Sequence, residues 1–309
     1  MGVYILKRLG LMVVTIFVVI TLTFVIMQFL PGSPYENEAK LSDQQIEALN
    51  KKYGFDKPIP VQYVRYVGNV VKGDLGESFQ FGGRAVTKVV GERLTVSAQL
   101  GVESIIIGTI LGILLGVVAA LRQGTFTDYG AVILAVLGIS VPSFLLAVIL
   151  QFVFSIWLGW FPVAYWKGPI YHVLPVIALA TGILAQISRF MRTEMVEVLG
   201  SDFIVFAKSK GLGSFSVIAK HSVRNALIPI ITIIGPMTAG IITGSLVIEK
   251  IFAIPGIGQQ FVESIYTNDY PVIMGTTILY TVAFVIIIFV TDLLYGIVDP
   301  RIRLQGGSS

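Results

Sequence analysis

Long apolar runs dominate this sequence and restrict what the chain can fold into. A membrane-spanning helix needs about 20 consecutive apolar residues, and six stretches reach this length: residues 9–30, 98–121, 131–158, 173–192, 228–250 and 272–297. Only 13% of the residues are charged, whereas ordinary soluble domains carry roughly 25%. The sequence therefore predicts an all-α integral membrane protein with six transmembrane helices.

Proline residues interrupt several of these runs. The third run is long for one span, and we expect Pro142 to bend it or to mark a break. Pro175, Pro229 and Pro236 also lie in or near predicted spans. Proline is tolerated there because neighbouring helices can satisfy the carbonyl groups that it leaves without a hydrogen bond.

The first run could be a retained span or the core of a cleaved signal peptide. It follows Lys7 and Arg8 and extends over residues 9–30 without a charge. A signal-peptide core has roughly 7–15 residues and is followed by a small-residue cleavage site, and no such site is obvious before Pro31. We expect a retained span that enters the membrane from the cytosol, with the cleaved signal as the alternative.

The distribution of Lys and Arg predicts the orientation, because short cytosolic loops carry an excess of these residues. With a cytosolic N-terminus, eleven basic residues lie on the inside: Lys7, Arg8, Arg122, Arg189, Arg192, Lys208, Lys210, Lys220, Arg224, Arg301 and Arg303. The short outer loops contain only Lys167 and Lys250, and the other nine lie in a long first loop. We expect a multi-pass membrane protein with both termini cytosolic. The dispersed basic residues do not indicate a nucleic-acid partner.

The segment between the first two spans is too long for a plain connector. Ser42-Asp-Gln-Gln45 is a capping-box pattern that predicts the start of a helix, and Gly54-Phe-Asp-Lys-Pro58-Ile-Pro60 ends that helix. A second helical run follows, and then the turn-rich stretch Gly73-Asp-Leu-Gly76-Glu-Ser-Phe79. We predict a small helical cap on the outer face. Its aromatic residues leave open the alternative of a segment at the membrane surface.

The predicted spans divide the chain into four parts. These are the cytosolic N-terminus with span 1 (1–30), the extracytoplasmic helical loop (31–97), a core of spans 2–6 that includes a cytosolic loop at 193–228 (98–300), and a cytosolic tail (301–309). In the last outer loop, Ile254-Pro-Gly256-Ile-Gly258 predicts a turn, and residues 259–266 predict a helix that lies along the surface.

The largest basic insertion among the apolar runs follows the fourth predicted span. It begins with Ser201 and Asp202, residues that typically cap a helix N-terminus. Phe203, Phe206 and Ala207 follow at positions i, i+3 and i+4, and therefore share one face of the predicted helix.

The second half of this insertion predicts how the short helix ends. Lys208 and Lys210 lie in its last turn, where the helix dipole favours cations. Gly211 suits the left-handed position that follows a helix C-terminus. Ser214 can then cap a second helix that ends before Pro229. The first helix is short and amphipathic, and such an element fits a groove on a partner protein.

Residue patterns for most chemical functions are missing from the sequence. No G-x-x-x-x-G-K-[ST] phosphate loop occurs, so we do not expect ATP to bind by that route. The sequence has no cysteine, and His172 and His221 are far apart without clustered carboxylates, which argues against a metal site. An integral membrane enzyme would need a clustered nucleophile or metal set, and the chain has neither pattern.

Few charged residues fall within or near the predicted spans. Glu103, Glu249 and Asp292 do so, near span ends. We interpret them as interfacial or paired structural charges, and a proton or ion relay is the alternative. A chain without central charges and without its own ATP site must obtain energy from a partner or act passively.

Several polar residues within the spans could line a hydrated path through the membrane. These are Ser140, Ser143, Gln151, Gln186, Thr238, Thr243 and Ser245. Small residues in the fifth span, including Gly235 and Gly240, could thin the helix beside such a path, but close helix packing explains them equally well.

The basic insertion resembles the cytoplasmic loop of binding-protein-dependent ABC importer permeases. The resemblance lies in Asp202-Phe-Ile-Val-Phe-Ala207-Lys-Ser-Lys210-Gly211-Leu212 and in His221-Ser-Val-Arg224-Asn225-Ala-Leu-Ile-Pro229. Within this family, the chain most resembles the oligopeptide/dipeptide branch, and within that branch the permease subunit with a long first outer loop. Further matches cover nearly the whole chain: Pro31-Gly32, Gly54-Phe-Asp-Lys-Pro58-Ile-Pro-Val-Gln-Tyr63, Gly73-Asp-Leu-Gly76-Glu-Ser78, Val141-Pro-Ser-Phe144, Phe252-Ala-Ile-Pro-Gly256-Ile-Gly258 and Asp299-Pro300-Arg301.

The sequence also departs from the family pattern in places. The broad importer pattern has Glu-Ala-Ala, followed by Gly four residues after the last Ala. Ala207 and Gly211 match this pattern, whereas Val205 and Phe206 stand where Glu and the first Ala would be. The resemblance therefore implies a docking face that is more apolar than usual.

The resemblance implies a type I ABC importer permease fold in a bacterial or archaeal inner membrane. It implies that the chain forms half of a translocation pathway and pairs with a second permease, usually a different chain. Two partner ATPase subunits would bind ATP and Mg, and an extracytoplasmic peptide-binding protein would deliver the substrate. The helix from Ser201 to Leu212 would dock on an ATPase and couple its closure to alternating access.

The substrate and the mode of action remain open at the level of sequence. Dipeptides, oligopeptides, glutathione, nickel chelates and peptide pheromones are all compatible with the resemblance. The alternative function is an autonomous channel or an ion-coupled carrier for small solutes. A channel or carrier of this kind is expected to contain charged residues at the centre of its spans or an internal repeat, and the sequence shows neither.

Overall fold

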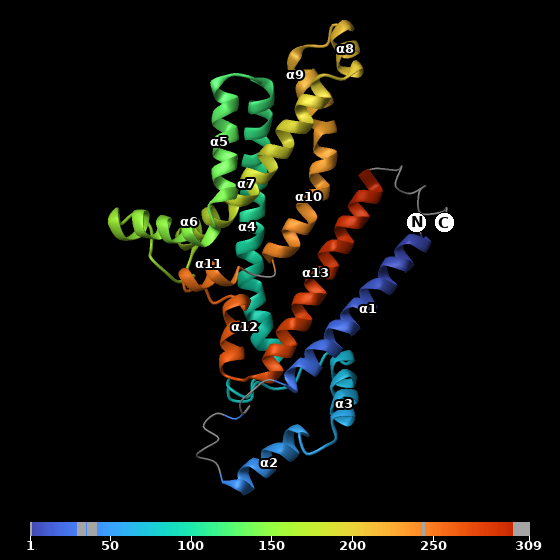
Figure 1. Ribbon diagram of the computed structural model, residues 1–309, viewed down its shortest axis with the longest axis vertical. Helices are drawn as coiled ribbons and strands as arrows, with labels where there is room; N and C mark the ends of the chain where they lie inside the picture. The colour runs from blue at the N-terminus through green and yellow to red at the C-terminus, as the bar shows by residue number, and fades with distance from the viewer. Residues whose placement is uncertain (1, 30–34, 36–41, 243–244, 299–309) are drawn as a thin grey trace. The chain divides into compact units, whose positions relative to one another are not determined.

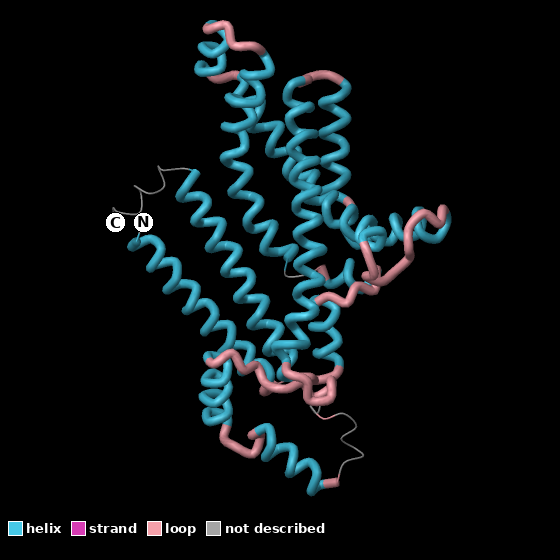
Figure 2. Tube along the Cα trace, turned by 180° about the vertical axis from the view of Figure 1, so that it is seen from behind, coloured by secondary structure: helices cyan, strands magenta, loops and turns pink. Residues whose placement is uncertain are grey.

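The computed structural model describes residues 2–29, 35, 42–242 and 245–298 (Figure 1). These residues form helices and loops without a β-strand (Figure 2). The chain divides into two compact units. Unit 1 consists of Met1–Val96 and Gly256–Val285, and unit 2 consists of Ser97–Pro255 and Ile286–Ser309.

Unit 1 joins the two ends of the sequence in one core. Its helices are α1 (Gly2–Met27), α2 (Asp43–Tyr53), α3 (Ile59–Val71), the start of α4 (Val86–Leu121), α12 (Ile257–Tyr266) and the first part of α13 (Tyr270–Val298). Seven of its buried apolar residues form a cluster: Ile20, Leu75, Val86, Val90, Ile257, Val272 and Ile278. The start of α4 therefore packs with helices from both ends of the chain.

The helices predicted for the first loop are confirmed. The hydroxyl group of Ser42 accepts the backbone N–H of Gln45, and the Gln45 side chain accepts the backbone N–H of Ser42 at 2.8 Å, which completes the capping box. Gly54 ends α2 with φ +80°, a left-handed conformation that favours glycine. Pro60 then lies in the first turn of α3, where its missing N–H costs no helical hydrogen bond.

A buried carboxylate holds the turn that follows α3. Asp269, fully buried, accepts the hydroxyl of Ser78 and the backbone N–H groups of Phe79 at 3.2 Å and Gln80 at 3.3 Å. Such a carboxylate compensates for its burial with several donors. This contact gives the Gly73–Ser78 motif a structural role, because it fastens the motif to the residues that precede α13.

Unit 2 contains the longest run of helices. It comprises the rest of α4, α5 (Phe126–Ser140), α6 (Ser143–Leu150), the π-helix η2 (Gln151–Trp157), α7 (Pro169–Leu199), α8 (Asp202–Ser209), α9 (Ser214–Ser216), the π-helix η3 (Val217–Val223), α10 (Arg224–Ile242), α11 (Leu246–Ile251) and the end of α13. One buried cluster of this unit consists of Ala120, Ile183, Ile187, Met191, Met195, Ala226 and Ile230.

A stripe of glycines lets α4 approach α7 closely. Gly108, Gly112 and Gly116 are spaced by four residues, and a Cβ atom on any of them would lie within 3.0 Å of backbone or Cβ atoms of α7. Small residues at this spacing are typical of tightly packed membrane helices. The G-x-x-x-G-x-x-x-G pattern of these three residues in the sequence is a signal for this close approach.

The predicted spans correspond to the helices of the structure. Among the described residues, five helices are long and apolar enough to cross a membrane: Ile5–Met27, Val86–Leu121, Pro169–Leu199, Ser214–Ile241 and Tyr270–Leu293. The pair Phe126–Ser140 and Ser143–Trp157 passes the same test together and is bent by 100°. This pair occupies the third predicted span, and the predicted break at Pro142 is confirmed.

Several predicted boundaries were wrong. The second span begins with α4 at Val86 rather than at residue 98, because its first turns pack into the unit 1 core. The helix predicted at residues 259–266 is present but begins at Ile257; it buries Ile257, Gln260 and Ser264 and exposes Ile265 and Tyr266. The fifth predicted span, 228–250, is interrupted, since α10 ends at Ile242 and α11 begins at Leu246.

Candidate functional site

The candidate docking helix is α8, and its N-terminus differs from the prediction. Ser201 occupies the N-cap position with an extended backbone, φ −77° and ψ 150°. Its hydroxyl group donates to the carbonyl oxygen of Val198 at 2.5 Å, however, and makes no capping bond to α8. Asp202 is the first residue of α8, where the positive end of the helix dipole stabilises its negative charge. The predicted side-chain cap by Ser201 is therefore wrong.

The C-terminus of α8 confirms the prediction for Gly211. This residue has φ +81°, and its N–H donates to the carbonyl of Lys208 at 2.9 Å. The N–H of Leu212 donates to the carbonyl of Ala207 at 3.3 Å. These two bonds form a Schellman motif, which needs a left-handed residue at this position. The ammonium group of Lys210 lies 4.5 Å from the ring centroid of Phe206, a cation–π contact.

The apolar face predicted for docking, which contains Phe203, Phe206 and Ala207, is exposed at the two phenylalanines but not at Ala207. Ile204 is fully buried and Ala207 is 7% exposed, and both pack against Val217 and Val198. Phe203 and Phe206 are 46% and 61% exposed. Ala207 therefore belongs to the core of the hairpin and does not share the exposed face with the two phenylalanines.

The exposed apolar surface of this loop, which we call the α8 face, is larger than predicted. It consists of Phe203, Val205, Phe206, Leu212 and Phe215, all of which are exposed. Lys208 and Lys210 are also exposed and place positive charge beside it. An apolar surface of this size on a polar hairpin is typical of a contact with another protein.

The segment after α8 is one continuous helix rather than a short second helix. Gly213, not Ser214, occupies its N-cap position, and α9, η3 and α10 follow without a break. The helix does not end before Pro229, which lies inside α10. The hydroxyl of Ser222 donates to the carbonyl of Val217 at 3.1 Å, within the π-turns of η3. α8 packs on Val217 of η3, and η3 continues directly into α10.

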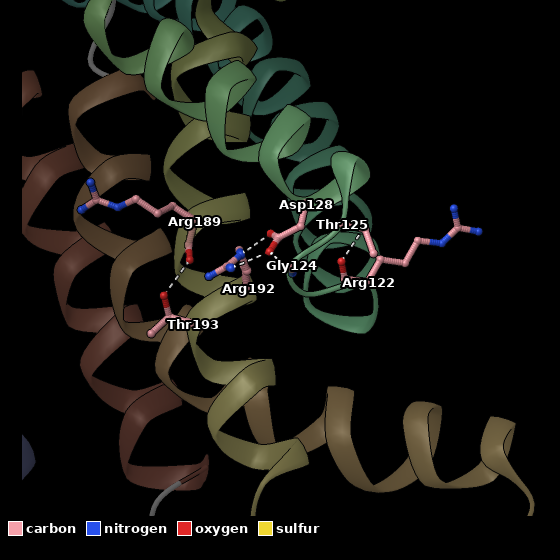
Figure 3. A network of polar contacts seen from close by, with 7 residues as sticks. All are labelled: Arg122, Gly124, Thr125, Asp128, Arg189, Arg192 and Thr193. Atoms are coloured by element: carbon pink, nitrogen blue, oxygen red, sulfur yellow. Dashed lines mark hydrogen bonds and ion pairs between the residues drawn. The ribbon is translucent and has the colours of Figure 1, made fainter.

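An ion pair between α5 and α7 was not identified from the sequence (Figure 3). Nε of Arg192 lies 2.5 Å from one carboxylate oxygen of Asp128, and a terminal nitrogen of Arg192 lies 2.7 Å from the other. The same carboxylate accepts the backbone N–H of Gly124 at 3.0 Å. Asp128 is the only charged residue between Arg122 and Lys167. This isolation in an apolar run was the signal for a buried pair.

The charges that the sequence placed near span ends have partners. A carboxylate oxygen of Glu103 lies 3.0 Å from Nδ1 of His172, and the ring of His172 stacks on Trp166 at 3.6 Å between centroids. Glu249 is fully buried and accepts the hydroxyl of Ser97 at 2.6 Å. Glu103 thus pairs with an ionisable partner and Glu249 with a hydroxyl group, and their purely structural role stays a prediction.

The candidate path residues do not converge on one place. The amide of Gln151 donates to the carbonyls of Val163 at 2.8 Å and Ile251 at 3.1 Å, so it fastens η2 to neighbouring segments. The hydroxyl of Thr238 donates to a carbonyl of its own helix. Four further candidates occupy different positions: Ser140 and Ser143 flank the bend, Gln186 is half-buried on α7, and Ser245 precedes α11. Thr243 lies outside the described residues, and the path stays a prediction.

Comparison with known proteins gives matches along the whole chain. The family described as "Binding-protein-dependent transport system inner membrane component" matches residues 112–304. The family described as "Binding-prot-dependent transport system membrane comp, N-term" matches residues 1–101.

Individual relatives are similar over nearly their full length. The dipeptide transport system permease protein DppB of Lactococcus lactis subsp. cremoris is 48% identical over 301 residues, which are 97% of this chain and 99% of that protein. DppB of Bacillus subtilis is 48% identical over 98% of both chains. The oligopeptide transport system permease protein OppB of Haemophilus influenzae is 39% identical over 97% of this chain and 99% of that protein.

Solved structures share the fold at lower identity. The MetNI methionine ABC transporter in an inward-facing conformation matches with a TM-score of 0.57 and 16% identity, over 69% of this chain and 97% of that chain. An amino acid ABC transporter matches with a TM-score of 0.53 and 16% identity, over 68% of this chain and 94% of that chain.

Proposed function

This chain belongs to the family of binding-protein-dependent transport system inner membrane components and is the transmembrane subunit of an ATP-driven importer, and we propose that the solute it imports is a peptide. The observation that carries this proposal is the identity to two DppB proteins along nearly the whole chain. A dipeptide is favoured over a longer peptide, because the identity to the OppB proteins is lower.

The α8 face is proposed to dock on an ATPase subunit. Phe203, Val205 and Phe206 give it an apolar surface, and Lys208 and Lys210 give it charge at the rim. Docking interfaces commonly combine a buried aromatic anchor with a polar rim. The packing of Ile204 and Ala207 on Val217 supports this role, since it makes the hairpin rigid and joins it to α10.

The proposed complex contains other ABC transporter subunits. We propose a second permease that is a different chain, two ATPases and an extracytoplasmic peptide-binding protein. ATP and Mg would be bound by the ATPases rather than by this chain. In the proposed orientation both termini and the α8 loop are cytosolic, residues 31–97 are outside, and each permease forms half of the pathway.

Two measurements test the peptide and partner proposals. Affinity purification from native membranes in a mild detergent should recover a second permease and two ATPases. Cells that lack this chain should lose uptake of a labelled dipeptide and regain it on complementation. Recovery of a transport-competent chain by itself would instead support an autonomous carrier, and unchanged uptake in the deleted cells would refute the peptide substrate.

The docking proposal can be tested by cross-linking, because the natural chain contains no cysteine. Phe206→Cys should form a cross-link to an ATPase subunit with a short bifunctional maleimide. Tyr266→Cys is the matched control, since Tyr266 is also an exposed aromatic residue but lies in the proposed outer loop. A membrane-impermeant maleimide added from outside should label Tyr266→Cys and not Phe206→Cys. The reverse labelling would refute the orientation.

A further inference from the structure

Two sequence motifs without an assigned binding role meet at one cavity in unit 1. The first, at Gly54 and Phe55, lies between α2 and α3, and the second extends from Gly73 to Phe79. Both contribute to the lining of a cavity of about 220 Å³, together with residues of α1, α3 and α13. Since Ser78 of the second motif is anchored to the buried Asp269, this wall of the cavity is held in place.

Aromatic rings form the apolar part of this cavity. Phe79 lies edge-on to Tyr53 with 4.5 Å between ring centroids, and Phe55 contacts Phe79 in the same way at 6.1 Å. Phe24 stacks on Tyr66 at 5.9 Å. Burial raises the pKa of the Tyr66 phenol, so this side chain stays neutral. These rings suit the apolar body of a small ligand.

Four charged side chains line the cavity, and two of them neutralise each other. Lys52 and Glu77 form an ion pair at 3.3 Å. Arg65 has no hydrogen-bond or ion-pair partner in the part of the chain that the structure describes. Asp74 accepts the backbone N–H of Gly76 at 2.9 Å, and no described Lys or Arg pairs with it. The cavity therefore presents one cation and one anion that are free to bind a ligand.

The backbone segments that carry these two charges lie close together. A terminal nitrogen of Arg65 lies over Gly54, where an added Cβ atom would be only 3.0 Å away. Asn69 is one helical turn beyond Arg65 on α3, and its carbonyl accepts the N–H of Asp74 at 3.0 Å. Arg65 and Asp74 thus attach to the same wall about one helical turn apart, which is about 5.4 Å.

We propose that this cavity binds a small zwitterion with an apolar body. Arg65 would bind the anionic group, Asp74 the ammonium group, and the rings the apolar part. A dipeptide with free termini has this chemistry, because its terminal groups are about 6–7 Å apart at about 3.3–3.6 Å per residue. A phosphatidylethanolamine headgroup has the same charges. The peptide form of the ligand rests on the proposed function.

The test is equilibrium binding of labelled Leu-Phe to the whole importer, without its binding protein and without ATP. The complex is placed in nanodiscs of phosphatidylcholine and phosphatidylglycerol. Arg65→Gln should weaken binding of Leu-Phe and of N-acetyl-Leu-Phe about tenfold or more, since it removes a charge-assisted hydrogen bond. It should leave the already weaker binding of Leu-Phe-amide unchanged. Asp74→Asn should weaken binding of Leu-Phe and of Leu-Phe-amide, which keep the ammonium group. It should leave binding of N-acetyl-Leu-Phe unchanged.

Control variants separate this pattern from a loss of folding. Arg84→Gln and Asp56→Asn remove charges of exposed ion pairs that do not line the cavity, and they should bind all three ligands like the wild type. A misfolded variant would lose binding of all three ligands equally. A loss that depends on which terminus of the peptide is blocked therefore indicates a direct contact between the substituted residue and that terminus.

The remaining arms distinguish the two ligand sources. If phosphatidylethanolamine is the natural occupant, its addition to the nanodiscs displaces Leu-Phe. In that case Arg65→Gln also lowers the amount of phosphatidylethanolamine that stays bound to the importer after purification. Equal binding of Leu-Phe and of phosphatidylethanolamine by Arg65→Gln, Asp74→Asn and both controls would overturn the inference. Dipeptide uptake by cells is measured in parallel. If the variants show normal uptake and unaltered binding, only the proposed binding role of the cavity is refuted. If wild-type cells take up no dipeptide, the proposed peptide function is refuted.

Discussion

Neutralising Asp128 tests whether the ion pair between α5 and α7 carries stability. The carboxylate accepts two bonds from Arg192, at 2.5 and 2.7 Å, and one from the N–H of Gly124. Asp128→Asn keeps the size of the side chain but removes its charge. Arg192 then stays where it is, without the negative charge that compensates for its burial.

The magnitude follows from the burial of the two partners. Removal of one partner of a buried ion pair costs about 3–5 kcal/mol. The side chain of Asp128 is 3% exposed, but that of Arg192 is 27% exposed, so water screens part of the remaining charge. We therefore expect the low end of this range, about 3 kcal/mol, which corresponds to a fall in melting temperature of roughly 6–12 °C. The double variant Asp128→Leu/Arg192→Met removes both charges and should recover most of this loss.

The assay is thermal unfolding of the purified chain in one detergent, followed by the loss of helical circular dichroism. Glu92→Gln is the control, because it removes one partner of the exposed Arg84–Glu92 pair. Such exposed pairs contribute about 0–1 kcal/mol. The reasoning is wrong if Asp128→Asn lowers the melting temperature no more than Glu92→Gln, or if the double variant is as unstable as the single one.

Three further predictions concern packing, the α8 loop and the membrane surface. Gly116→Ala should destabilise the chain by about 1–3 kcal/mol, because its Cβ would lie 2.6 Å from the Ser188 carbonyl oxygen, whereas Gly182→Ala has nothing within 4 Å and should be neutral in the same melting assay. Gly211→Val should lower dipeptide uptake and ATPase recovery, since β-branched residues disfavour φ +81°; Gly211→Asn tolerates this conformation and should retain most of both, and an equal loss would instead indicate a steric clash at the interface. All three tryptophans lie within residues 157–166, so brominated phospholipids should quench tryptophan emission if this loop lies at the membrane surface, and emission without quenching would place it inside the complex.

Hydrophobicity was sufficient to locate the membrane-spanning segments, but not their ends. A span is a property of about 20 neighbouring residues, so each of the six apolar runs overlaps a long helix or, for the third run, a bent pair of helices. The ends depend on distant contacts. The first turns of α4 are helical beyond the apolar run because Val86 and Val90 pack against residues of α12 and α13.

The roles of charged residues were harder to predict, because they depend on partners far along the chain. Asp128 and Arg192 are 64 residues apart, and Ser78 and Asp269 are 191 residues apart. The isolation of Asp128 indicated that it has a partner, but no local pattern predicts which distant residue that partner is. Counting Arg192 among the cytosolic basic residues was compatible with the orientation rule, but it missed the contact that holds α5 to α7.

The placement of Ala207 on the same face as the two phenylalanines was wrong, and the physical reason has a consequence for mutagenesis. Residues 203–207 are all apolar, so Phe203 with Phe206 and Ile204 with Ala207 satisfy the same i, i+3 spacing, and periodicity cannot choose between the two faces. Val217, on the next helix, decides the choice, because it packs only with the second pair. Substitutions at Phe206 therefore act on the surface proposed for docking, whereas a polar residue at Ala207 disrupts the core of the hairpin. Although Phe206 and Ala207 are adjacent, loss of transport after a substitution at Ala207 therefore indicates that the loop has lost its rigid packing, not that a docking contact is missing.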